Sequence, residues 1–240
     1  MKPFNMTFAF LPLAFIAGGC GHAAGTRPHE LSAPQHEAAA AQEDVQASDH
    51  AAQHDPSATT TEERCSAGKG RVCWTVSTNP TDSHVKTAAE HRELAAQHRA
   101  ASQALRDAEA RACAGVSDED RDTSPFAHVA DIRSVAELKG EGQSRTGKVK
   151  TERTIGATIT LNAVPGLTEE WLQRIVTCHL ARNAAVGHDM AEMPYCPLVP
   201  RGAQASVRSV GDGFAVDIKA DDSEAAAEIW RRAQQLKPGQ

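Results

Sequence analysis

The stretch IGATITLNAVPGLTEEWLQRIVTCHL, residues 155–180, carries the clearest structural pattern in the chain. Its first part alternates apolar residues with smaller or polar ones, which predicts a half-buried strand. Pro165 and Gly166 then turn the chain. Thr168 suits the N-cap of a helix, and two glutamates follow in the first turn. The apolar face of this helix is formed by Trp171, Leu172, Ile175, Val176, His179 and Leu180.

A hairpin and a last helix follow. Residues 203–207 and 214–218 each alternate apolar with polar side chains, and Gly-Asp-Gly at 211–213 predicts the tight turn between them. The last helix begins at one of residues 221–223. Its buried face is formed by Ala226, Ile229, Trp230 and Ala233.

The order strand, helix, hairpin, helix predicts an α+β fold for residues 155–240. A two-layer βαββα sandwich, with the helices covering one face of the sheet, buries all of these apolar faces. This plan resembles the split βαβ arrangement of ferredoxin-like domains.

Upstream, residues 65–117 predict a strand at 72–76 and one long helix at 82–113, which is rich in good helix formers. A heptad stripe indicates packing on a partner helix or on a second copy of the chain. The stripe consists of His84, His91, Leu94, His98, Ala101, Leu105 and Ala108.

The three histidines of that stripe do not form a metal site within one helix. Seven residues separate neighbours by about 10.5 Å along the axis, whereas each zinc–nitrogen bond is about 2 Å. They are therefore interpreted as surface histidines unless a dimer pairs them. The next segment, 118–154, is polar and contains glycine, and is expected to be a loop-rich connector with one strand.

Residues 21–64 have a different composition. Leu31 and Val45 are their only long aliphatic side chains, and eight acidic residues against two basic ones give a local charge of −6. Such a segment is expected to be a disordered tether. Its histidines allow a second interpretation, a metal-collecting tail. These are His22, His29, His36, His50 and His54.

The N-terminal sequence predicts localisation to the cell envelope. Lys2 precedes an apolar run at 8–17, too short for a permanent membrane span, which is typical of a secretory signal peptide. The following residues, Ala17-Gly18-Gly19-Cys20, resemble the lipobox of bacterial lipoproteins, with Ala17 where leucine is usual. The resemblance implies a signal peptide at 1–19, lipidation of Cys20 and a tether at 20–64. The alternative is cleavage near Ala23 or Ala24 and release of a secreted protein.

By the same resemblance, Gly21 and His22 lack the aspartate that commonly retains lipoproteins in the inner membrane. An outer-membrane lipoprotein that faces the periplasm is therefore expected. The several acyl chains that the resemblance implies would give a stable anchor.

Five cysteines remain after Cys20, in a compartment that permits disulfides. Local pairs, Cys65 with Cys73 and Cys178 with Cys196, each close a short loop and are preferred, although the sequence does not fix the connectivity. Cys113 would then be a free, buried thiol. No C-x2-C pair supports a zinc site.

The irregular stretch 187–201 offers a candidate copper site. His188, Met190 and Met193 combine the imidazole and thioether ligands that Cu(I) prefers, in a manner similar to the His/Met motifs of periplasmic copper-handling proteins. The other interpretation is a proline-stiffened loop whose methionines pack on the sheet.

Enzymatic activity is not expected. The sequence contains no G-x-S-x-G, H-E-x-x-H or Walker motif, and the adjacent Cys178 and His179 point about 100° apart on a helix. The net charge of −6 also argues against nucleic-acid binding. We therefore expect a lipid-anchored envelope protein with a binding or scaffolding role, a protein partner and no cofactor. The alternatives are a periplasmic copper- or zinc-binding protein and an unrecognised envelope enzyme.

Overall fold

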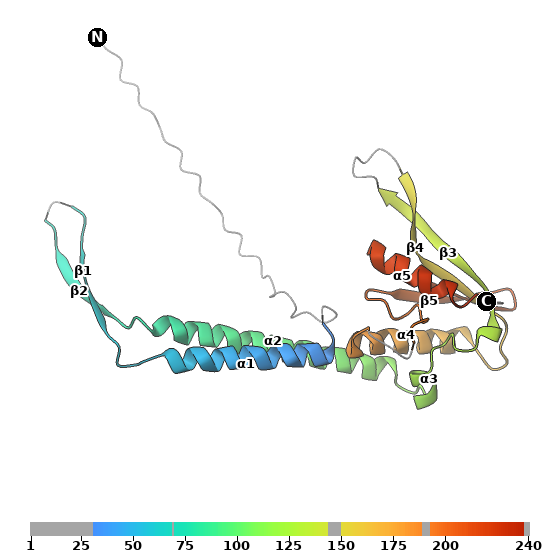
Figure 1. The fold of residues 1–240 in the computed structure, drawn as a ribbon, viewed down its shortest axis with the longest axis horizontal. Coiled ribbons are helices and arrows are strands. Elements are labelled where there is room, and N and C mark those ends of the chain that lie inside the picture. Colours follow the sequence, from blue (N-terminus) through green and yellow to red (C-terminus); the bar gives the residue numbers. More distant parts are fainter. Residues whose placement is uncertain (1–30, 69, 144–149, 189–192, 238–240) are drawn as a thin grey trace, which may run out of the picture.

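A computed structural model of the chain describes residues 31–68, 70–143, 150–188 and 193–237. Figure 1 shows a long two-helix arm that extends from a C-terminal α+β domain and ends in a two-stranded ribbon. The α+β class expected from the sequence is confirmed. Within the described ranges, no helix combines the length and the apolar character needed to cross a membrane.

The C-terminal domain is built on a four-stranded antiparallel sheet with the order β3-β4-β6-β5. The strands are β3 (Ile132–Gln143), β4 (Lys150–Leu161), β5 (Gln204–Val210) and β6 (Gly213–Lys219). Because β6 pairs antiparallel with both β4 and β5, those two strands are parallel to each other. The helix between them makes this a split βαβ unit, as the sequence order indicated.

Two helices cover one face of this sheet, namely α4 (Glu169–Val186) and α5 (Ser223–Gln234). The cross-strand partners Ile159 and Val216 point into the core, where they join Leu172 of α4 and Ile229 of α5. The opposite face contains polar side chains: Thr158 donates a 2.6 Å hydrogen bond to Asp217 there. The expected two-layer arrangement is therefore confirmed.

The domain begins earlier than the predicted boundary at residue 155. Residues 118–154 contain the short helix α3 (Asp118–Asp122), a 3₁₀ turn (Val129–Asp131), the one expected strand, β3, and the first part of β4. The connector interpretation is wrong because β3 pairs along β4 and belongs to the sheet. Its apolar residues are irregularly spaced, and a register shift between Leu138 and Lys139 contributes to that irregularity.

The prediction of a disordered tether is also wrong for residues 33–53. They form α1 (Ala33–Gln53), which packs along α2 (Asp82–Ala112), the long helix expected from the sequence. Ser32 and Gln35 form a reciprocal capping box at the start of α1. Alanine has the highest helix propensity, and a neighbouring helix supplies the burial that the segment lacks alone. Residues 21–30 lie outside the described residues.

The arm ends in a ribbon of β1 (Thr60–Cys65) and β2 (Cys73–Thr78), which pair antiparallel. Only β2 was expected from the sequence, as a strand at 72–76. The prediction of a disordered tether is therefore wrong for residues 60–64 as well. The predicted disulfide between Cys65 and Cys73 is confirmed and joins the ends of the two strands.

The predicted pair Cys178 with Cys196 is wrong. Cys178 forms a disulfide with Cys113, and Cys196 is the buried free cysteine among the described residues. The correct pairing links residues 65 positions apart in the sequence. It forms because the C-terminal end of α2 docks on α4, a tertiary contact that a preference for short loops cannot anticipate.

Candidate functional site

The two helices of the arm meet along a seam rich in alanine and histidine. We define the seam as the residues that occupy the facing heptad positions within 33–54 and within 84–105. In α1 the seam contains Ala33, His36, Ala40, Glu43, Ala47, His50 and, just after the helix, His54. In α2 it contains His84, Ala88, His91, Ala95, His98, Ser102 and Leu105. The alternating spacing of three and four residues is typical of a coiled coil. Small alanines let the helices approach closely, so the histidine rings of one helix reach those of the other.

The buried end of the seam holds the pair His36 and His98. Their Nδ1 atoms are 3.0 Å apart, and the two residues are 0% and 6% exposed. One Nδ1–H donates to the other Nδ1, so at least one ring has an unprotonated Nδ1. The contact joins two helices whose sequences are 62 residues apart.

A second histidine group lies nearer the ribbon and is half-buried. The Nδ1 atoms of His50 and His84 are 3.1 Å apart. The ring of His91 stacks on that of His50 with centroids 5.5 Å apart. Glu43 of α1 lies 2.6 Å from Nδ1 of His91. Three imidazoles and one carboxylate therefore lie side by side across the two helices.

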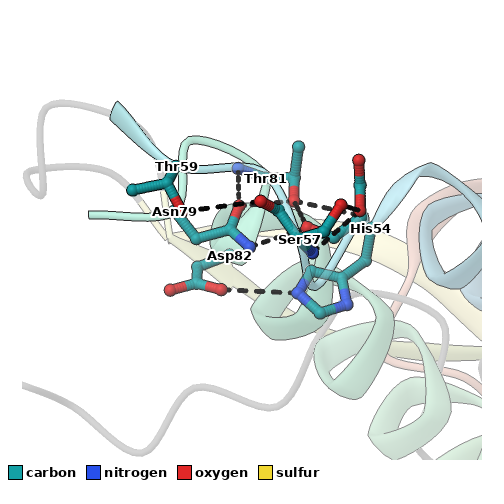
Figure 2. Close-up of polar contacts among 7 residues, drawn as sticks. His54, Ser57, Thr59, Asn79, Thr81 and Asp82 are labelled. Carbon is teal, nitrogen blue, oxygen red and sulfur yellow. Dashed lines mark hydrogen bonds and ion pairs between the residues drawn. The ribbon is translucent and has the colours of Figure 1, made fainter. Parts of the chain in front are cut away.

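The ribbon end of the arm is closed by polar contacts, which Figure 2 shows. The side-chain amide of Asn79 donates to the carbonyl oxygen of Asp55 at 2.7 Å. The backbone N–H of Asp55 donates to the hydroxyl of Thr81 at 3.1 Å. Nε2 of His54 lies 3.4 Å from the carboxylate of Asp82. These contacts fix the path of the chain from each helix into the ribbon.

Charges on the flanks of the seam are complementary. Glu37 of α1 pairs with Arg106 of α2 at 2.6 Å, and Asp44 pairs with Arg99. These exposed pairs contribute little stability individually. They do explain why an acidic segment packs on this helix, since its carboxylates face arginines.

The arm is fixed to the domain where α2 and α1 meet α4. Leu105 is buried against Ala184 and Ala185, and the disulfide between Cys113 and Cys178 lies at the same junction with its Cα atoms 4.6 Å apart. The arm is therefore attached to the sheet domain both covalently and by apolar packing.

His179 of α4 lies at this junction and is buried. Burial lowers its pKa below the ordinary value of 6.5, while a hydrogen bond to the carbonyl oxygen of Asp120 opposes the shift. At neutral pH the imidazole is therefore neutral and donates from Nε2. His179 does not activate a thiol at the adjacent Cys178, because that sulfur is in a disulfide.

This pKa shift makes the stability of the domain depend on pH. Below pH 6.5, the ordinary value for histidine, the unfolded chain takes up a proton that folded His179 resists. The free energy of unfolding is therefore expected to fall as the pH drops from 7.5 to 5.5. Urea denaturation at both pH values measures the fall, and His179→Gln reduces it while His128→Gln, at an exposed position, does not. Equal falls in both variants would show that His179 is not responsible.

The structure describes only some of the other predicted site residues. Nδ1 of His188 lies 2.7 Å from the carbonyl oxygen of Val199, and Met193 is buried in the sheet core. Met190 and Cys20 lie outside the described residues. A copper site at His188, Met190 and Met193 stays a prediction, although Met193 packs as the alternative interpretation expected.

The seam is not predicted when the two histidine sets are considered separately. The residues of 33–54 repeat with the same heptad spacing as those of 84–105, and that shared period was the available signal. The expectation that the helix stripe packs on a partner helix is confirmed, and the partner is α1.

Comparisons with known proteins add no relative to this description. Models of protein families, the curated proteins and the solved structures were each searched, and none matched the chain. Proposals for the function rest on the residues of the chain itself.

Proposed function

We propose that the protein is a non-enzymatic binding or scaffolding protein of the cell envelope, whose arm presents the ribbon to a protein partner. The lipobox-like residues up to Cys20 support attachment to the outer membrane, facing the periplasm, through a lipidated N-terminus. The two disulfides support this location, because such bonds persist in oxidising compartments.

One observation carries the proposal: the ribbon is ordered but packs mainly on itself. Two-stranded hairpins are marginally stable alone, and here the disulfide between Cys65 and Cys73 holds the strands together. Val72 is 64% exposed and Trp74 is 49% exposed at this tip. Exposed aromatic side chains are characteristic of recognition surfaces.

The backbone of the ribbon offers a mode of binding. In the described part of the chain, β1 and β2 pair only with each other, so each strand keeps one unpaired edge. A partner that presents an extended strand can add to such an edge by main-chain hydrogen bonds. The ribbon side chains Glu62, Arg64 and Trp74 would then provide specificity.

Cys196 has the character of a packed core residue. Cys196 is the described free thiol, and burial raises its pKa, so the unreactive protonated form predominates at neutral pH.

Photo-crosslinking in intact cells tests this role. A photoreactive amino acid at Thr75, exposed on β2, is expected to give a discrete crosslinked product. The same group at Ser206, exposed on the sheet domain, is the matched control and is expected to give none. The Trp74→Ala substitution should reduce the Thr75 product at least tenfold. Failure to crosslink at Thr75, or equal products at both positions, would contradict the proposal.

A further inference from the structure

The histidine group near the ribbon brings imidazole nitrogens of α1 and α2 close together. His50 and His84 place two Nδ1 atoms 3.1 Å apart. Two nitrogens bound to one tetrahedral zinc ion, each about 2.0 Å from it, lie about 3.3 Å apart. The two side chains therefore need to separate by only a few tenths of an ångström to hold an ion between them.

The protonation of this pair is compatible with metal binding. Because the two Nδ1 atoms share a hydrogen bond, one of them already has a free lone pair directed at the other. A divalent ion can replace the shared hydrogen when the ring that carries it changes tautomer, its proton moving through solvent from Nδ1 to Nε2, so that both rings stay neutral. The rings tilt so that the ion lies beside the line between the two Nδ1 atoms, at a bonding distance from each. No redox step or additional reactant is required.

The surroundings supply further ligands. His91 stacks on His50, and its Nδ1 contacts the carboxylate of Glu43 at 2.6 Å. When Nδ1 donates to that carboxylate, the lone pair is on Nε2, which is the common arrangement of a metal-binding histidine. His91 does not lie within ligand distance of the other two histidines in this structure. Among the described residues, the close group of three potential ligands is Glu63, Cys65 and Cys73. The two sulfurs of that group form a disulfide. A change in the His91 side-chain torsions that keeps its contact with Glu43 would bring Nε2 to the ion, and water at this half-buried position would supply the remaining ligand.

The second pair, His36 and His98, provides an internal comparison. Its Nδ1 atoms are equally close, at 3.0 Å. However, both residues are buried, so solvent cannot supply the remaining ligands of an ion. Access and additional ligands therefore favour the group near the ribbon.

We propose that His50 and His84, assisted by His91, bind one divalent transition-metal ion of the zinc or copper(II) class and clamp the arm next to its ribbon. Imidazole nitrogen is a preferred ligand for both ions. This inference concerns the arm alone and does not depend on the partner proposed for the ribbon. The ion would stabilise the paired helices, because binding to the folded state alone shifts the folding equilibrium.

Calorimetric titration of zinc chloride into the oxidised, chelator-treated full chain at pH 7.5 tests the site. One ion per chain is expected to bind at the arm. The double variant His50→Gln with His84→Gln should weaken that binding at least tenfold, and Glu43→Gln should weaken it about tenfold by removing the carboxylate that orients His91. His128→Gln, the matched control, should leave it unchanged. His188→Gln reports separately on the loop site expected from the sequence.

A second measurement uses the unsubstituted protein, so that a folding defect cannot obscure the result. Zinc should slow the modification of His50 and His84 by diethyl pyrocarbonate, detected by mass spectrometry, and should not slow that of His128. Far-UV circular dichroism should show that the double variant retains its helices. Absence of binding, equal binding by the double variant, or no protection of His50 and His84 would each overturn the proposal.

Discussion

Replacing both Cys113 and Cys178 by serine is expected to lower the free energy of unfolding by about 4 kcal/mol. The disulfide spans 65 positions and joins the arm to α4. Its removal increases the conformational entropy of the unfolded chain and leaves the attachment of the arm to apolar packing around Leu105. Urea denaturation followed by far-UV circular dichroism measures the loss.

The other disulfide provides the matched control. Cys65 and Cys73 are 8 positions apart in a ribbon that packs mainly on itself. Substitution of both by serine should release the ribbon but leave the main unfolding transition unchanged. If both double substitutions destabilise the main transition equally, the disulfide to α4 does not contribute more to the stability of the chain than the disulfide of the ribbon.

The substitution Gly156→Ala is expected to destabilise the sheet by about 3 kcal/mol or more. A Cβ atom at this position of β4 would lie 1.8 Å from the carbonyl oxygen of Ile218 in β6. The obstacle is backbone, so no change of rotamer relieves it, and the two central strands must separate. Thermal and urea denaturation measure the effect.

A second glycine is the control that separates the effect of this clash from the effect of a left-handed backbone conformation. Gly202 has a positive φ of 76°, and nothing lies within 4 Å of a Cβ atom placed there. Gly202→Ala should therefore cost only about 1 kcal/mol, from the left-handed conformation alone. Similar losses at both positions would mean that β4 and β6 do not approach as closely as described.

Local patterns in the sequence were sufficient for much of the fold. The helix at 82–113 could be predicted because its composition and its lack of glycine and proline act locally. The strand at 155–163 and the hairpin turn at 211–213 were equally clear, because alternation and glycine spacing are local signals. These elements alone define the α+β class.

Composition alone did not predict α1, the other helix of the arm. The disorder expected for residues 21–64 rested on their lack of long apolar side chains, and that criterion fails where alanines pack between two helices. Ala40 and Ala47 are almost fully buried although each buries little area. The pairing of Cys113 with Cys178 was not predicted either, because it depends on how the arm docks on the domain.

The candidate site shows the same division. The seven-residue spacing of His84, His91 and His98 correctly excluded chelation within one helix, and cross-helix pairing was considered only through a dimer. The partner rings come from α1 of the same chain, at His36 and His50. The site was hidden because its second half lay in a segment expected to be unfolded.

Hydrogen–deuterium exchange of residues 33–53 in the oxidised full chain tests the arm most directly. The account predicts that these amides exchange as slowly as those of 88–105, because both helices bury the same seam, and that His36→Asp accelerates exchange in both segments together. Complete exchange of 33–53 within seconds, while 88–105 remains protected, would contradict the account and would show that residues 33–53 are the disordered tether expected from the sequence.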